Sequence, residues 1–139
     1  MVIALAGRRV DPQDTTESRF PARQAIPVQE RIRKLLKHNQ ATDLVCSAAC
    51  GADLLALEVA GKLGIQRHIV LPFARDNFRR TSVSDRPGNW GQQYDCILDE
   101  VEREGELVSL GLSDDDPAAF ATTNITILER AVKLADEAG

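Results

Sequence analysis

The chain has 139 residues, of which 43% are hydrophobic, so it holds enough apolar side chains for one core and one domain, residues 1–139. Its formal net charge of −4 argues against a general nucleic-acid binder or membrane-surface binder, because both use a positive field to attract phosphate groups. No apolar run reaches membrane-span length and no basic leader precedes the first apolar run, so we expect a cytoplasmic protein.

The cysteines predict neither disulfides nor a metal site. Three cysteines cannot all pair, and Cys46 and Cys50 lie in or beside a predicted buried strand, which indicates reduced thiols. A metal held by these two thiols would need companion ligands, but His38 and His68 are isolated in the sequence. We therefore expect no metal and no cofactor.

The first predicted strand is the apolar run from Val2 to Ala6, which is typical of a strand buried on both faces of a parallel sheet. Gly7, Arg8 and Arg9 follow directly. Because ligands of open α/β sheets collect at the carboxyl ends of strands, these three residues are candidates to bind an anion. The alternative is that both arginines are solvated surface residues.

A polar segment, Asp11 to Ile26, predicts a long loop that is either mobile or folded over a ligand, with Phe20 as its large apolar anchor. The spacing of apolar residues then predicts a helix from Pro27 to about His38, with a charged outer face.

The central stretch of the sequence is a predicted strand from Asp43 to Cys46, a loop of small residues, and a helix from Asp53 to about Lys62. Small side chains leave backbone N–H groups unshielded, and the start of a helix carries unsatisfied donors and partial positive charge, so a phosphate group fits there. Asp53 either caps this helix or accepts a hydrogen bond from a ligand hydroxyl group. The candidate ligand-binding residues of this stretch are Ser47, Ala48, Gly51, Ala52 and Asp53. For Gly51 the alternative is a turn residue with positive φ.

A third strand is predicted from Ile65 to Phe73, with His68 as a strand residue rather than a catalyst. The segment from Phe73 to Gly91 is rich in charged and turn-forming residues, and we interpret it as a functional loop. Trp90 either packs on the core or stacks on a base, and we favour packing. Its candidate ligand-binding residues are Arg79, Arg80 and Arg86.

The rest of the chain predicts a helix from Gln92 to Glu102, a strand from Leu107 to Leu112, and a last helix with Pro117 in its first turn. Asn124, a polar residue early in that helix, is a further candidate ligand contact. The residues expected to face inward from the last helix are Phe120, Ile125, Ile127, Leu128, Val132 and Leu134.

Alternation of strands and helices predicts an α/β fold, Rossmann-like, with three layers and a parallel sheet of about four strands. The last helix should lead into another strand, so we expect that this C-terminal strand is lacking, either because the chain is a fragment or because a partner completes the sheet. Exposed sheet edges and the wide apolar face of the last helix favour a homo-oligomer or a docked effector domain.

The segments VIALAGRR, LVCSAACGADLLALEVA, IVLPF and FRRTSVSDRPGNWG resemble the SLOG superfamily, the Rossmann-like group related to the lonely-guy phosphoribohydrolases and to DNA-processing protein A. The resemblance covers nearly all of the chain. It implies that the small-residue loop, from Ser47 to Asp53, holds the phosphate or ribose of a nucleotide and that Gly7, Arg8 and Arg9 form the loop after the first strand. Many SLOG domains sense nucleotide-derived signals beside effector domains, so the resemblance implies ligand binding without turnover.

The leading hypothesis is therefore a sensor domain that binds a nucleotide or a nucleotide-like phosphate ligand. An alternative is a phosphoribohydrolase that removes the base from a nucleoside monophosphate, with Asp53 or Asp85 as the required carboxylate. The chain has no PGGxGTxxE segment, which carries the catalytic glutamate of lonely-guy enzymes. A DNA-binding module is the third hypothesis, and the acidic balance argues against it.

Overall fold

The structure is a computed structural model that describes residues 1–13 and 18–139. Its four strands are β1 (Val2–Ala4), β2 (Asp43–Cys46), β3 (Gln66–Leu71) and β4 (Glu106–Ser109). Its helices are α1 (Ala25–His38), α2 (Ala52–Lys62), α3 (Arg75–Ser82), α4 (Trp90–Glu104) and α5 (Ala119–Ala138), with a 3₁₀ turn, η1 (Ala22–Gln24), before α1.

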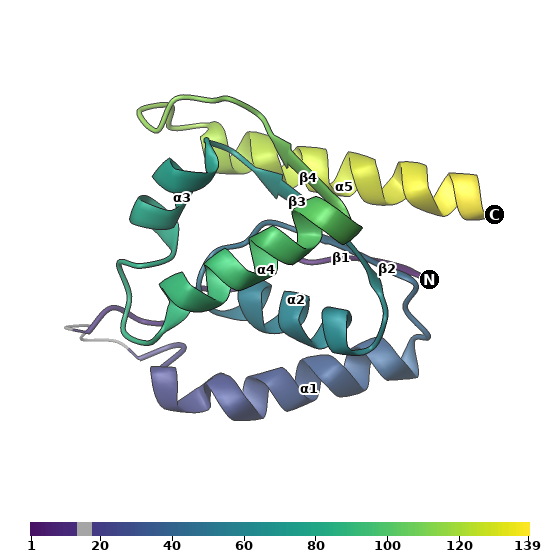
Figure 1. The fold of residues 1–139 in the computed structure, drawn as a ribbon, viewed down its shortest axis with the longest axis horizontal. Helices are drawn as coiled ribbons and strands as arrows, with labels where there is room; N and C mark the ends of the chain where they lie inside the picture. Colours follow the sequence, from purple (N-terminus) through teal and green to yellow (C-terminus); the bar gives the residue numbers. More distant parts are fainter. Residues whose placement is uncertain (14–17) are drawn as a thin grey trace.

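All pairings in the sheet are parallel, and the strands stand in the order β1-β2-β3-β4. Because each strand pairs with the next one in the chain, right-handed crossovers place α1, α2 and α4 on the same face of the sheet. Helix α5 returns across the opposite face, over β1, β2 and β3 (Figure 1). The predicted α/β, Rossmann-like, three-layer fold with four parallel strands is confirmed.

The larger part of the core lies between the sheet and the α1/α2/α4 layer. Side chains alternate along β2, so Leu44 and Cys46 pack in this larger cluster, whereas Val45 packs under α5 with Val70 and Ile127. Helix α2 contacts both α1 and α4 as well as the sheet, and it is buried along most of its length. The ionisable residue of α2 that this packing buries is Asp53.

His68 is a buried residue of β3, as predicted, and the fold supplies partners that the sequence spacing could not show. Its Nε2 lies 2.9 Å from a carboxylate oxygen of Asp43, and its Nδ1 lies 3.4 Å from one of Glu106. Arg130 of α5 donates two hydrogen bonds of 2.8 Å to the same Glu106 carboxylate, which holds the pKa of Glu106 below its ordinary value. This network joins neighbouring strands to α5.

The predicted loop between Phe73 and Gly91 contains helix α3, so that part of the prediction was wrong. The segment is too polar to show a helical pattern, and the helix forms because Phe78 is buried against Phe73 and Tyr94, at ring-centroid distances of 6.4 and 6.2 Å. Tertiary packing rather than local periodicity stabilises α3.

The start of α2 also differs from the expectation. Asp53 does not cap this helix: the N-cap is Gly51, with φ of 113°, and no side chain caps the helix. Asp53 lies in the first turn instead. Gly51 is a turn residue with positive φ, which was the alternative prediction for it. An added Cβ at this position would lie 2.6 Å from the carbonyl oxygen of Arg8.

Helix α5 buries a narrower stripe than predicted. Its buried residues, Ala119, Thr123, Ile127 and Ala131, recur every four positions, because a straight helix lying across a sheet touches it along one line. The expectation of inward-facing side chains was wrong for Phe120, Ile125, Leu128 and Val132, which are 55–59% exposed. Pro117 precedes α5 rather than lying in its first turn.

The remaining expectations concern single anchors. Phe20 is buried, as predicted, and residues 14–17 of the predicted loop lie outside the described residues. Trp90 packs on the core as predicted, with its Nε1 donating to the carbonyl oxygen of Pro87 at 2.8 Å. All three cysteines are free thiols. Within the described part of the chain, no helix combines the length and the apolar character needed to cross a bilayer.

Candidate ligand pocket

A pocket of about 570 Å³ opens at the carboxyl ends of the strands, a volume that suits a small organic ligand. The loops after β1 and β2, helix α3, the loop before α5 and the first turns of α5 all contribute to it. Its lining residues are Leu5, Ala6, Gly7, Arg9, Ser47, Ala49, Asp53, Phe73, Phe78, Thr81, Ser82, Asp114, Phe120, Thr123, Asn124 and Ile127.

Two buried oxygen atoms of the lining have no hydrogen-bond partner among the described residues. One is Oδ1 of Asp53, whose residue is only 7% exposed, and the other is Oγ of Ser47. The second carboxylate oxygen of Asp53 accepts from the backbone N–H of Ala49 at 3.2 Å. A buried polar atom without a partner costs about 1–3 kcal/mol, so a ligand group that pairs with it recovers that free energy.

The carboxyl group of Asp53 has a pKa of about 7, raised from 3.8. Burial in the apolar surroundings of α2 is the main cause, because it disfavours the charged form. The backbone N–H of Ala49, which donates to Oδ2, partly offsets this effect by stabilising the carboxylate. The N–H of Gly7 adds a smaller effect of the same sign and leaves Oδ1 without a hydrogen bond. Near neutral pH the group therefore exists in both protonation states.

Three phenylalanine rings from different elements line the pocket. Phe73 follows β3, Phe78 lies on α3, and Phe120 lies on α5, where its ring meets that of Phe73 edge-on at a centroid distance of 5.7 Å. Phe120 is 55% exposed, so its ring is accessible to a ligand. Phe73 and Phe78 are buried, so Phe120 is the ring of the three that offers a surface to a flat, apolar ligand group such as a base.

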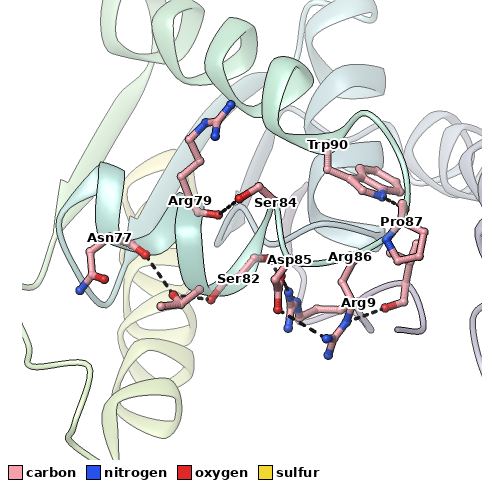
Figure 2. Close-up of polar contacts among 11 residues, drawn as sticks. Arg9, Asn77, Arg79, Ser82, Ser84, Asp85, Arg86, Pro87 and Trp90 are labelled. Atoms are coloured by element: carbon pink, nitrogen blue, oxygen red, sulfur yellow. Dashed lines mark hydrogen bonds and ion pairs between the residues drawn. The ribbon is translucent and has the colours of Figure 1, made fainter. Parts of the chain in front are cut away.

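Arg9 is the candidate arginine that lines the pocket, and the segment after α3 holds it in place (Figure 2). Its Nε donates to the carbonyl oxygen of Ser82 at 3.1 Å, and its Nη2 forms an ion pair with Asp85. The same Ser82 oxygen accepts the backbone N–H of Cys50 at 3.1 Å. Arg9 is thus oriented by its neighbours, and Asp85 compensates part of its charge.

The arginines of the segment around α3 bind other parts of the protein. Arg79 makes two hydrogen bonds, of 3.0 and 3.2 Å, to Asp95 of α4. Arg86 donates from Nε to the carbonyl oxygen of Val10 at 3.1 Å, and its Nη1 lies 3.4 Å from Asp85 (Figure 2). The structure does not bring Arg79 and Arg86 into the pocket lining.

Arg80 lies at the rim of the pocket. Its Nη2 donates to the side-chain oxygen of Asn77 at 2.6 Å and lies 3.4 Å from Asp114, a lining residue. Asn124 lines the pocket as an exposed residue of α5. These two candidates are therefore near the opening rather than at the buried end.

The small-residue loop after β2 uses several backbone donors within the protein. Besides the Ala49 and Cys50 bonds, the N–H of Ala52 donates to the carbonyl oxygen of Arg8 at 3.1 Å. Ala48 is fully buried, and Gly51 is buried against the loop after β1. These residues join the two loops, and neither Ala48 nor Gly51 is among the lining residues.

Arg8 and Ala52 face a different hollow, of about 420 Å³, beside α1 and the start of α2. Its other lining residues are Arg19, Phe20, Gln24, Val28 and Arg31. The predicted site residues are therefore divided: Gly7, Arg9, Ser47, Asp53 and Asn124 meet in the larger pocket, whereas Arg8 and Ala52 do not reach it.

Sequence reasoning missed the aromatic side of the pocket. Phe73 stands two residues after the end of β3, which is a position that could have marked it. Phe78 required knowledge of α3, and Phe120 was assigned to the core. Within residues 1–13 and 18–139, no group of three or more His, Cys, Asp and Glu side chains is arranged to hold a metal ion.

Comparison with known proteins adds no family assignment. No protein-family model matches the chain, and a search of curated proteins found no significant match. The resemblance to the SLOG superfamily stays a prediction, and the case for a function depends on the geometry of the pocket.

Proposed function

We propose that this domain binds a nucleotide or a nucleotide-like phosphate ligand in the pocket at the carboxyl ends of the strands and acts as a ligand-sensing domain. The observation that carries the proposal is the pair of unsatisfied buried oxygens, Asp53 Oδ1 and Ser47 Oγ, in the same pocket as the exposed ring of Phe120. Such a pocket offers polar partners for a hydroxyl-bearing group and an apolar surface for a ring in the same ligand.

The positive charge of Arg9 favours a phosphate group on its side of the pocket. Arg9 contributes a guanidinium group that is held in a fixed orientation, and Arg80 stands at the rim. A charge-assisted hydrogen bond to phosphate contributes about 1.5–3 kcal/mol. Arg9 lies in the loop after β1, and ligands of parallel α/β sheets collect at the loops that follow the strands.

Calorimetric titration with a panel of ribonucleoside monophosphates and their nucleosides tests the proposal. We expect micromolar to millimolar binding of at least one nucleotide, and about a tenfold or greater loss of that affinity in Arg9→Gln, which removes the charge facing the pocket. Arg79→Gln is the matched control, since Arg79 is paired with Asp95 outside the pocket, and it should keep the wild-type affinity. Failure of every nucleotide to bind at millimolar concentration would refute the proposal.

A second candidate, hydrolysis of a nucleoside monophosphate, is favoured by one observation. A carboxyl group with a pKa of about 7 is suited to take or give a proton near neutral pH, and Asp53 is such a group in the pocket. Release of free base from AMP by the wild-type protein, and its loss in Asp53→Asn, would identify this activity. Absence of free base while nucleotide binding persists would leave the sensing role.

A further inference from the structure

We infer that the buried end of the pocket is a hydroxyl-binding subsite formed by Asp53 Oδ1 and Ser47 Oγ, so that the ligand enters with its ribose first and its phosphate remains toward Arg9. This inference depends on the proposed function. Of the two groups that the resemblance assigns to the loop after β2, phosphate or ribose, it selects the ribose, and it adds a test of which nucleotide class is bound.

The buried end of the pocket disfavours an anion. Asp53 places its own carboxyl group at the start of α2, where a phosphate would otherwise lie, and its Oδ2 takes the N–H of Ala49. The N–H groups of Cys50 and Ala52 are paired with carbonyl oxygens. A phosphate at this point would find these N–H donors already occupied. It would also lie beside the negative charge of the Asp53 carboxylate at low dielectric, which is unfavourable.

A hydrogen-bond donor fits the same point. The ionised Asp53 oxygen accepts only, whereas the Ser47 hydroxyl both donates and accepts. A ligand hydroxyl group donates to Asp53 and at the same time accepts from Ser47, so it satisfies both buried atoms. An exocyclic amino group of a base is a poor acceptor and would leave the Ser47 proton without a partner.

Ribose carries the required groups, and its neighbouring hydroxyls present donors to both oxygen atoms. With a ribose at Asp53, the rest of a nucleotide extends toward the aromatic rings of Phe73 and Phe120 and toward the guanidinium group of Arg9, all of which line the same pocket. The arrangement predicts that the protein discriminates ribonucleotides from deoxyribonucleotides.

The experiment measures the affinity of each ribonucleoside monophosphate and of its 2′-deoxy and 3′-deoxy counterparts by calorimetry at about pH 8. We expect loss of a ribose hydroxyl to weaken binding by about 10- to 150-fold, which is the range for a hydrogen bond to a charged group. This ratio should fall toward one in Asp53→Asn and in Ser47→Ala. It should persist in Asp95→Asn, which makes the same change at a carboxylate that pairs with Arg79 outside the pocket.

The possible outcomes separate this inference from the proposed function. Equal affinity for a ribonucleotide and both deoxy counterparts overturns the ribose-first orientation while leaving nucleotide binding intact. A ratio that Asp53→Asn and Ser47→Ala do not change places the hydroxyl elsewhere and also overturns it. If no nucleotide binds, the proposed function fails and this inference fails with it. Circular dichroism of each variant establishes that the fold is retained.

Discussion

Replacing Asp53 with asparagine removes a carboxyl group that is only 7% exposed and that titrates at about 7 instead of 3.8. Because its pKa is higher in the folded protein than in the unfolded chain, the folded protein retains this proton at a pH where the unfolded chain has released it. The stability contribution of the neutral group is therefore present at low pH. It is lost as the pH rises from about 4 to about 7.

The size of the effect follows from the shift. Each unit of pKa corresponds to about 1.4 kcal/mol, so the whole change between about pH 4 and about pH 8 amounts to about 4 kcal/mol of unfolding free energy. Asp53→Asn has no such titration. The amide brings a cost of its own, about 1–3 kcal/mol if its N–H groups lack acceptors, but that cost does not depend on pH.

Urea unfolding of both proteins at about pH 4 and about pH 8 measures the difference. We expect the wild type to lose about 4 kcal/mol of stability relative to Asp53→Asn over this range, while other titrating groups cancel in the comparison. Asp114→Asn, at an exposed carboxylate of the same pocket, should follow the wild-type profile. Parallel pH profiles for wild type and Asp53→Asn would show that the buried carboxyl group does not titrate as stated.

Two further predictions concern stability and assembly. Gly51→Ala should destabilise the fold by about 2–4 kcal/mol, because φ is 113° and the added Cβ would lie 2.6 Å from the Arg8 carbonyl oxygen. Gly64→Ala should cost about 1 kcal/mol, because its φ is 73° but no atom lies within 4 Å of the added Cβ. Equal losses of stability in urea unfolding would refute this prediction. The exposed stripe of α5 predicts self-association that Leu128→Lys abolishes and that Leu35→Lys, at an exposed leucine of α1, leaves unchanged. Light scattering measures it, and a wild-type mass near 15.2 kDa at every concentration would rule out the dimer.

The order and type of most elements could be read from local patterns. The short apolar run of β2, the helical spacing of α4 and the glycine at the start of α2 each reflect a local requirement of backbone geometry or burial, and such requirements are visible in a window of a few residues. Trp90 was correctly expected to pack for the same reason. Helix α3 was not visible, since its formation depends on burying Phe78 against residues from β3 and α4.

The site depended far more on the tertiary structure. Sequence position placed Arg9, Ser47 and Asp53 at strand ends, and parallel strands bring such ends together, so these residues meet as expected. Carboxylates elsewhere in the chain decided which arginines are available to a ligand. Arg79, for example, is bound by Asp95 of α4. The pKa of Asp53 was decided by its burial and by the backbone N–H groups of Ala49 and Gly7, because the pKa of a carboxyl group depends on the dielectric and the donors around it. Gly7 and Ala49 follow different strands, and only the fold brings them together at this carboxyl group.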